Sequence, residues 1–251
     1  MLVMAKAPIP GFAKTRLCPP ATPEQAAQLA AASLLDTLDA ALGTGAPVVV
    51  ALTGDVAHGV MASEVQHALR RVDVIPQRGD GLGERLAHAH ADAAVLQPGA
   101  PVLQIGMDTP QVTARVLAAA MAPVAAVSPA PNAVSPIPDA VSPAPDVDAV
   151  LGAATDGGWW ALGLRDPAHA SVLTDVPMST SETGDRTRHA LRARGLRVAD
   201  LPVLSDVDTM ADARRIAPEV PDSRFARTLT KVLAAPTPHA RTPLGAHTSR
   251  S

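Results

Sequence analysis

The chain has 251 residues, of which 47% are hydrophobic and 18% are charged, and its formal net charge is −3. This length and composition fit one globular domain with a buried core, and the charge excludes the broad positive field of a protein that binds nucleic acid or acidic membranes. The single cysteine, Cys18, excludes an internal disulfide and fits a reducing compartment. The sequence has no apolar run of about 18 residues and no pattern of a secretory leader, so we expect a cytoplasmic protein.

Strand-like and helix-like segments alternate along the chain. The predicted strands are 2–7, 48–53, 72–76, 102–105, 149–153, 159–164 and 198–204. The predicted helices are 23–42, 60–71, 82–96, 112–121, 183–194 and 210–217, the first opened by a capping box of Thr22 and Gln25 and ended at Gly43. Several strands are continuous apolar runs, which indicates a mainly parallel sheet covered by helices on both faces. Ligands of such sheets bind at the carboxyl ends of the strands, so residues that follow a strand are the first site candidates.

A proline-rich segment interrupts this alternation. Residues 126–146 repeat a heptad three times, with two prolines in each copy. Prolines at this density exclude a helix or an interior strand, so we predict a surface loop inserted at 122–146 within a single domain of residues 1–235. A ligand for a proline-binding partner is the alternative function for the repeat. Residues 236–251 are polar and lack acidic side chains, which predicts a disordered tail.

The loop after the first strand carries the residue types of a phosphate-binding loop. Prolines stiffen it, a glycine permits close approach to its backbone, and three polar residues follow. Lys6 and Lys14 are two of only three lysines beside 18 arginines, which favours compact ammonium groups at this place. The spacing of a Walker loop is absent. We predict that the loop binds the phosphates of a nucleotide through Lys6, Pro10, Gly11, Lys14, Thr15 and Arg16.

The same loop, with the sequence Met4-Ala5-Lys6-Ala7-Pro8-x-Pro10-Gly11-x-x-Lys14-Thr15-Arg16-Leu17, resembles the signature of a small bacterial family of GT-A-type glycosyltransferase-like proteins. Members are described as arsenosugar-biosynthesis-type glycosyltransferases or as a domain of unknown function, and the family is distantly similar to the molybdenum-cofactor and deazaflavin-coenzyme nucleotidyltransferases. Further segments match in order: Gly81-Leu82-Gly83-Glu84-Arg85, Ile105-Gly106-Met107-Asp108-Thr109-Pro110, Gly152-Ala153-Ala154-Thr155-Asp156-Gly157-Gly158-Trp159-Trp160, Pro177-Met178-Ser179-Thr180 and Asp206-Val207-Asp208-Thr209. The resemblance implies a three-layer α/β/α GT-A fold, which is the nucleotide-diphospho-sugar transferase-like fold, with a mainly parallel mixed sheet.

The resemblance also implies a metal site. Asp108 follows an apolar strand where GT-A-type enzymes keep a metal-binding carboxylate, and Mg²⁺ or Mn²⁺ there would bridge the protein to a diphosphate. Classical sugar transferases carry Asp-x-Asp, whereas this chain has Gly106-Met107-Asp108. The second ligand is therefore expected after the last strand, at Asp208 or Asp206, an arrangement similar to that of the nucleotidyltransferases. The alternative for Asp108 is a cap on the next helix.

Contacts with the substrates are implied at three more places. The resemblance places nucleotide contacts at Gly83 and Arg85 and a second-substrate turn at Asp156, Gly157 and Gly158, for which a purely structural turn is the alternative. Adjacent side chains of a strand point to opposite faces, so one of the two tryptophans lines the cleft, and we assign Trp160. Thr180 is assigned to the acceptor, with helix capping near residue 183 as its alternative.

Three functions fit these residues. The first is metal-dependent transfer of a sugar from a nucleotide-diphosphate sugar to a small acceptor, with Lys14 and Asp108 as catalytic residues. The second is nucleotidyl transfer, in which a phosphorylated acceptor attacks a nucleoside triphosphate and pyrophosphate leaves. The third is a non-catalytic nucleotide-binding domain. The resemblance favours the first, the missing Asp-x-Asp favours the second, and the retained charged residues argue against the third.

Overall fold

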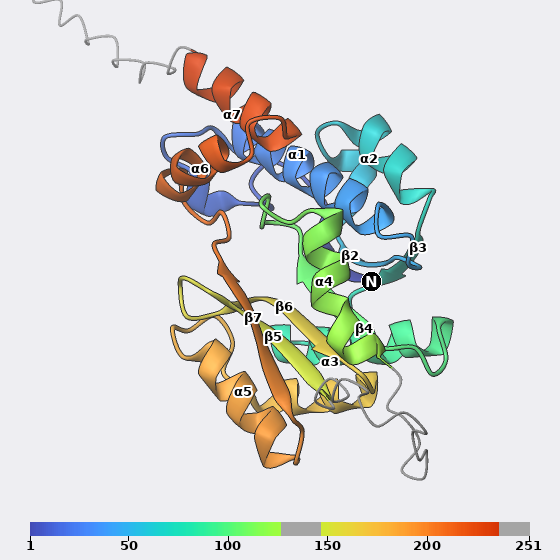
Figure 1. Ribbon diagram of the computed structural model, residues 1–251. Helices are drawn as coiled ribbons and strands as arrows, with labels where there is room; N and C mark the ends of the chain where they lie inside the picture. The colour runs from blue at the N-terminus through green and yellow to red at the C-terminus, as the bar shows by residue number, and fades with distance from the viewer. Residues whose placement is uncertain (127–146, 236–251) are drawn as a thin grey trace, which may run out of the picture.

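The computed structural model describes residues 1–126 and 147–235, and in these residues one seven-stranded sheet crosses the molecule (Figure 1). The strand order is β3-β2-β1-β4-β6-β5-β7, and every pairing is parallel except those that β6 makes with β4 and β5. The strands are β1 (Leu2–Lys6), β2 (Val49–Thr53), β3 (Asp73–Pro76), β4 (Val102–Gly106), β5 (Ala149–Ala154), β6 (Trp159–Leu164) and β7 (Val198–Leu204). All seven predicted strands are present, and the sheet is mixed and mainly parallel, as predicted.

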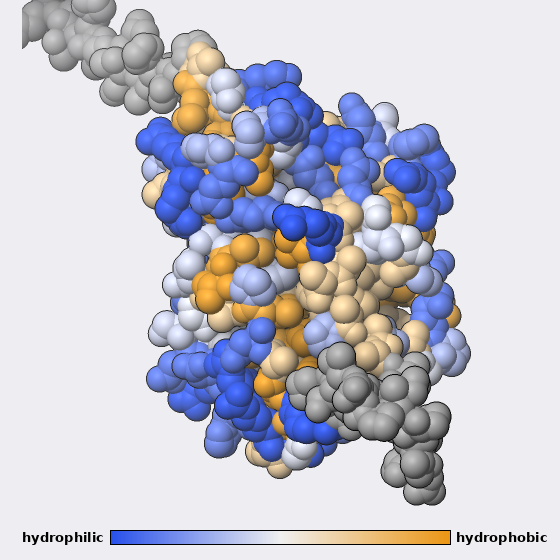
Figure 2. All heavy atoms as spheres, in the orientation of Figure 1, coloured by the Kyte–Doolittle hydropathy of each residue, from blue (hydrophilic) through white to orange (hydrophobic). Residues whose placement is uncertain are grey.

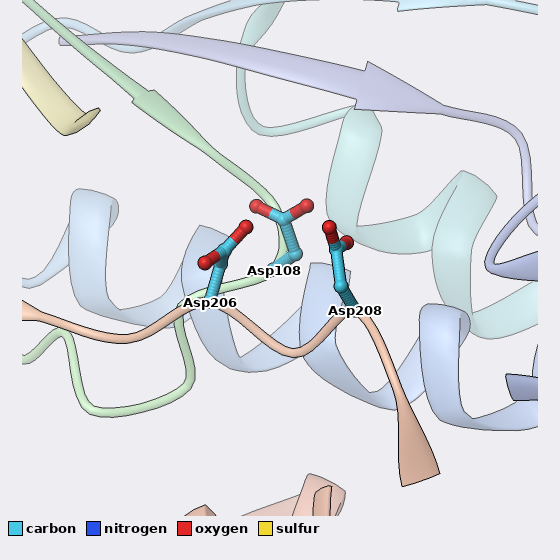
Figure 3. Close-up of side chains that lie close together, drawn as sticks. All are labelled: Asp108, Asp206 and Asp208. Carbon is cyan, nitrogen blue, oxygen red and sulfur yellow. The ribbon is translucent and has the colours of Figure 1, made fainter. Parts of the chain in front are cut away.

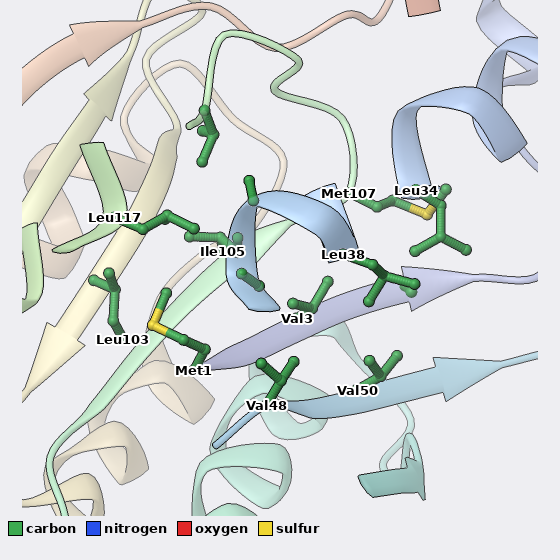
Figure 4. Packing of buried hydrophobic residues seen from close by; sticks show 14 of the residues in the cluster. Met1, Val3, Leu34, Leu38, Val48, Val50, Leu103, Ile105, Met107 and Leu117 are labelled. Carbon is green, nitrogen blue, oxygen red and sulfur yellow. The ribbon is translucent and has the colours of Figure 1, made fainter. Parts of the chain in front are cut away.

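Helices cover both faces of this sheet. They are α1 (Pro23–Leu42), α2 (Ala62–Leu69), α3 (Leu82–Leu96), α4 (Ala114–Ala125), α5 (Thr183–Ala193), α6 (Met210–Ile216) and α7 (Arg224–Ala234), with 3₁₀ turns η1 (Thr15–Leu17), η2 (Val56–His58), η3 (Pro167–Asp175) and η4 (Ala217–Glu219). Helices α1, α2 and α4 pack on one face, where Val3 and Ile105 lie in the core that Figure 4 shows. Helices α3 and α5 and the η3 turn pack on the other face, against Leu2, Val102 and Leu162. Neighbours such as Leu2 and Val3 enter different cores, which explains why the strands are continuous apolar runs.

Helix α1 packs between the sheet on one side and helices α6 and α7 on the other. Its predicted capping box is confirmed, because Thr22 accepts a hydrogen bond from the Gln25 amide and the Gln25 side chain accepts one from the Thr22 amide. The helix ends at Gly43, as predicted. Its buried residues occupy more than one side because the sheet covers one flank, while α6 and α7 pack on the other through a second core that includes Leu29 and Phe225.

Helix α7 was not among the predicted elements. Phe225, Leu229 and Val232 recur at helical spacing, and all three are buried in the core that α7 shares with α1. The side chain of Asp36 on α1 accepts hydrogen bonds from the backbone amides of Arg224 and Phe225, which satisfies two of the free N–H groups at the start of α7. The polypeptide after the predicted helices is therefore structured up to residue 235.

The ends of the predicted insertion are held by one arginine. Helix α4 continues through Pro123 to Ala125, so the first four residues assigned to the insertion are helical. The Arg165 guanidinium donates to the carbonyl groups of Pro123, Ala126 and Val147 and so joins the two sides of the segment. The heptad repeat and the predicted tail, residues 127–146 and 236–251, lie outside the described residues.

Figure 2 shows apolar side chains gathered over α4 in the middle of one face, where Ala118, Ala119 and Ala122 are exposed. Small side chains dominate this area, so it is apolar without large protruding groups.

Among the described helices, none combines the length and the hydropathy that spanning a membrane requires.

Candidate active site

A cavity of about 780 Å³ opens at the carboxyl ends of β1, β4 and β7. It brings together most of the residues predicted for the site: Lys6, Lys14, Thr15, Arg16, Arg85, Asp108, Asp156, Gly158, Trp160, Thr180 and Asp208 line it, and Asp206 joins them. Pro10, Gly11, Gly83 and Gly157 do not line it. The position is the one expected for a ligand of a parallel sheet.

Three aspartates converge in this cavity from two distant parts of the chain (Figure 3). Asp108 follows β4, and Asp206 and Asp208 follow β7 on either side of Val207. The Val207 side chain is buried and its backbone amide donates to the Asp108 carbonyl oxygen at 2.9 Å, which fixes the β7 segment beside Asp108. One carboxylate oxygen from each aspartate lies within 4.8 Å of the other two. The two candidates for the second metal ligand are therefore both at the site.

Lys14 lies between these carboxylates. Its Nζ is 2.8 Å from Asp108 Oδ2 and 3.1 Å from Asp208 Oδ1, and the Lys14 side chain is 13% exposed. Arg16 reaches Asp208 Oδ2 from the solvent side at 3.1 Å. Both cations form ion pairs with the predicted metal ligands, and their assignment to phosphate stays a prediction. The predicted phosphate loop and the predicted metal ligands therefore form one charged cluster.

The conformation of the opening loop explains how Lys14 reaches the cluster. Gly11 has φ of +75°, and Lys14 itself has φ of 52°, a left-handed conformation that costs energy for a residue with a Cβ. The Ile9 carbonyl accepts bonds from the amides of Phe12 and Ala13, which closes the turn before Lys14. Pro10 and Gly11 therefore shape the loop outside the cavity, and their assignment to phosphate stays a prediction. Lys6 lines the cavity, with its ammonium 5.6 Å from the centre of the Phe12 ring.

The charges of the cluster shift the pKa of two groups. Burial alone would lower the pKa of Lys14, but the charges of Asp108 and Asp208 and their hydrogen bonds raise it above its ordinary value, so Lys14 is a cation at neutral pH. Burial, followed by repulsion from Asp108, Asp156 and Asp208, raises the pKa of Asp206 to about 6. Three carboxylates meet two cations, Lys14 and Arg16, in this cluster, and hard oxygen donors in excess of cations fit Mg²⁺ or Mn²⁺.

The raised pKa of Asp206 predicts a pH dependence of stability. Because the folded pKa of about 6 exceeds the ordinary value of 3.8, the folded state binds the proton more tightly, and this contribution to stability is lost as the pH rises from about 4 to about 6. We expect Asp206→Asn to lose less stability than the wild type between pH 4.5 and pH 7.5, as measured by urea unfolding in EDTA. Equal losses in the two proteins would contradict the assignment.

The Asp156-Gly157-Gly158 turn packs on the segment that precedes α5. Asp156 Oδ1 accepts a hydrogen bond from the Gly158 amide, and the Asp156 carboxylate is exposed at the cavity. Gly157 has φ of +90°, and a Cβ there would lie 2.0 Å from the Ser181 carbonyl oxygen. The Gly157 carbonyl accepts from the Gly184 amide. Close packing therefore accounts for a glycine at position 157, and the assignment of Asp156, Gly157 and Gly158 to the second substrate stays a prediction.

The two tryptophans differ in burial. Trp160 is 3% exposed, its indole N–H donates to the Pro202 carbonyl, and its ring packs on Gly152. Trp159 is only partly buried and lines the same cavity, with its indole N–H donating to the Thr187 hydroxyl. Both tryptophans line the cavity, Trp160 from a core position and Trp159 from a partly buried one, and the assignment of Trp160 to the substrate stays a prediction.

Thr180 has the structural role that was its alternative. Its hydroxyl accepts a hydrogen bond from the Glu182 amide, and its own amide donates to the Thr183 hydroxyl, so both groups order the start of α5. Because Thr180 is exposed and lines the cavity, its assignment to the acceptor stays a prediction.

Gly83 is explained by packing. It lies in the first turn of α3, and a Cβ there would lie 2.2 Å from the Leu173 carbonyl oxygen of η3. Its assignment to the nucleotide stays a prediction, whereas Arg85, one turn from the N-terminal end of α3, lines the cavity.

We expect Gly83→Ala to destabilise the protein by about 1–3 kcal/mol in urea unfolding, because α3 and η3 must separate to admit the methyl group. Gly81→Ala is the matched control, since a Cβ at Gly81 meets nothing within 4 Å. Equal stability of the two variants would contradict this packing role.

Several cavity residues were missed by the sequence reasoning. Gln77 follows β3, and its side-chain amide donates to the carbonyls of Ala5 and Ala51 at 2.9 and 2.8 Å, which ties together the ends of β1 and β2. Gln104 lies inside β4 and Thr109 follows Asp108. A glutamine within a buried apolar strand is a recognisable signal, because such a side chain needs a partner.

Comparison with known proteins defines the class of the fold. The chain is similar to a candidate nucleotide-diphospho-sugar transferase from Desulfovibrio desulfuricans G20, with a TM-score of 0.73, 23% identity, and coverage of 92% of this chain and 93% of that one. The fold is therefore the GT-A-like fold of nucleotide-diphospho-sugar transferases, as predicted. Residues 34–180, more than half of the chain, match the model of the family described as an uncharacterized protein conserved in bacteria, DUF2064, and the chain belongs to that family. The matched span begins after the opening loop, so the loop signature and the arsenosugar relationship stay predictions.

Two other solved structures are more distant. CMP:2-keto-3-deoxy-manno-octonic acid synthetase complexed with CTP has a TM-score of 0.48 and 12% identity, with coverage of 86% of this chain and 95% of that one. Glucosyl-3-phosphoglycerate synthase from Mycobacterium tuberculosis, in complex with Mn²⁺, UDP and glucosyl-3-phosphoglycerate, has a TM-score of 0.46 and 11% identity, with coverage of 92% and 77%. Similarity at this level bears on neither the chemistry nor the substrates of this chain. No curated protein matches the sequence.

Proposed function

We propose that the protein is a metal-dependent glycosyltransferase that moves a sugar from a nucleotide-diphosphate sugar to a small acceptor. The observation that carries the proposal is the convergence of Asp108, Asp206 and Asp208 around Lys14 in the cavity at the carboxyl edge of the sheet. Residues 1–235 would act as one transferase domain, which the single sheet shared by the described residues supports.

The chain's own residues account for most of the chemistry that this reaction needs. Asp108 and Asp208, with Asp206 beside them, would hold Mg²⁺ or Mn²⁺, and such an ion would neutralise the charge that develops on a departing diphosphate. Lys14 would place a second positive charge beside the same oxygens. Arg16 and Lys6 at the cavity wall would orient the diphosphate, and Asp156 and Thr180 would face the acceptor.

Nucleotidyl transfer is the second candidate. One feature favours it: the acidic residues come from two segments, after β4 and after β7, and not from one Asp-x-Asp sequence. The same carboxylates and cations would then stabilise a transition state at the α-phosphorus of a nucleoside triphosphate.

Product analysis tests the proposal. The purified protein is incubated with MgCl₂ or MnCl₂ and a panel of labelled nucleotide sugars and nucleoside triphosphates, together with small hydroxylated and phosphorylated acceptors. Release of a nucleoside diphosphate is the expected result, and release of pyrophosphate would favour the second candidate. Nucleotide binding without either product would support a non-catalytic nucleotide-binding domain.

A further inference from the structure

Two buried polar side chains on one face of the sheet have no hydrogen-bond partner among the described residues. Gln104 is 3% exposed and its Oε1 is unpartnered, and His90 of α3 is fully buried with both ring nitrogens unpartnered. Buried polar groups are nearly always paired, because each one has given up its hydrogen bonds to water. Gln104 and His90 lie close enough for the amide to affect the pKa of the ring, but the geometry completes no hydrogen bond at Gln104 Oε1 or at the ring nitrogens.

Gln104 differs from His90 in that it reaches the active-site cavity. It lines the cavity, and its strand partners Leu2 on β1 and Leu162 on β6 belong to the cores on the α3 side of the sheet. Burial lowers the pKa of His90 to about 4, with Gln104 close enough to oppose this shift, so the ring behind the amide is neutral at physiological pH. The floor of the cavity thus offers an amide backed by a neutral imidazole.

The surroundings of Gln104 select the chemistry of a ligand. Met4, Leu86 and Trp159 line the same cavity with apolar surface, and the Trp159 N–H is already bonded to Thr187. A neutral amide and a neutral imidazole do not offset the charge of an anionic group in a buried place, whereas a hydroxyl group can donate to or accept from the Gln104 amide. Ser179, Thr180 and Ser181, which are exposed, add hydroxyl groups at the rim. A polyhydroxylated ring with apolar faces fits this combination.

We propose that Gln104 is a specificity-determining residue whose side-chain amide binds a hydroxyl group of the sugar ring of the nucleotide-diphosphate sugar. His90 is a positioning residue that lies behind the amide, and Trp159 provides the apolar surface beside the ring. This inference rests on the proposed glycosyl transfer, and it specifies that the donor is recognised through its sugar as well as through its diphosphate.

Binding measurements on Gln104→Leu test the inference. Quenching of tryptophan fluorescence, with Trp159 in the cavity, gives Kd in MnCl₂ for UDP-glucose, UDP-galactose, dTDP-glucose and GDP-mannose and for UDP, dTDP and GDP. We expect the wild type to bind one of these sugar nucleotides about tenfold or more tightly than the matching diphosphate, and Gln104→Leu to remove this preference while the Kd of the diphosphate stays within about threefold. Gln111→Leu is the matched control, because Gln111 also has an unpartnered buried Oε1 but does not line the cavity, and it should keep the preference.

A stability measurement separates recognition from a structural role. Exchange of an unpartnered buried amide for an apolar group of similar size should leave the Tm of Gln104→Leu equal to or above that of the wild type. A lowered Tm with an unchanged preference would overturn the inference in favour of a structural role. Equal weakening of the sugar nucleotide and the diphosphate would assign the amide to the base and overturn it as well. If Gln104→Leu keeps the preference for the sugar nucleotide over the diphosphate, the inference is overturned but the proposed function is not. If the wild type binds none of these nucleotides, the proposed function is overturned as well.

Discussion

Asp108→Asn is expected to lower kcat/KM by about 10³-fold or more and to leave the folded structure intact. Asp108 contributes a carboxylate to the cluster and forms a 2.8 Å ion pair with Lys14. The asparagine side chain of the variant therefore removes both the proposed metal ligand and the negative partner of the Lys14 ammonium. Stabilisation of a leaving group by a bound metal amounts to several kcal/mol, and each 1.36 kcal/mol is a factor of ten in rate. Initial rates at saturating Mg²⁺, with circular dichroism as a check of folding, give the result.

The matched control is Asp166→Asn, which makes the same charge change at the opposite edge of the sheet. Asp166 follows β6, whose last residue, Leu164, pairs with Val102 at the beginning of β4, and its side chain caps the η3 turn by accepting from the Ala168 amide. Asparagine serves equally well as a cap, so this variant should retain activity and stability. An Asp108→Asn protein with activity within about threefold of the wild type would remove Asp108 from the catalytic site.

The local features of the fold could be predicted because they follow from short patterns. The apolar run that becomes β4 and the capping box of Thr22 and Gln25 each depend on neighbours within a few residues. The position of β6 between β4 and β5 could not be predicted in the same way. It depends on pairings such as that of Ile105 with Ala161, which lie far apart in the sequence. It also depends on the register of the β5–β6 hairpin, in which Leu151 pairs with Leu162, and the sequence does not specify this register.

The site was predicted in its residue types but not in its contacts. Asp108, Asp208 and Lys14 were each assigned, yet the ion pairs between them join residues 94 and 194 positions apart and require a left-handed backbone at Lys14. No local pattern contains that information. Gly83 is a further contact that no local pattern contains: it packs against the Leu173 carbonyl of η3, a turn absent from the predicted elements, while its assignment to the nucleotide stays a prediction.

The contacts of Lys14 lead to the prediction with the most distinctive outcome, which is that Lys14→Met binds Mn²⁺ more tightly while it loses activity. The Lys14 ammonium occupies oxygens of Asp108 and Asp208 that a divalent cation would also need. Its removal takes away a competing positive charge and leaves three carboxylates facing one another. We expect the Kd for Mn²⁺, measured from the EPR signal of the free ion, to fall about tenfold. We expect kcat/KM to fall about 10²-fold or more, because a cation beside the leaving diphosphate is lost.

Arg16→Met is the control that separates this competition from a general effect of charge. Arg16 contacts Asp208 through Oδ2, and the Arg16 side chain is 72% exposed against 13% for that of Lys14. Because solvent screens the charge of Arg16, its removal should change the Kd for Mn²⁺ by less than about threefold. Without metal, Lys14→Met should unfold at a lower urea concentration than the wild type, since the carboxylates repel one another, and added Mn²⁺ should restore its stability. A weaker affinity for Mn²⁺ in Lys14→Met would mean that the ammonium organises the carboxylates for the metal and does not compete with it.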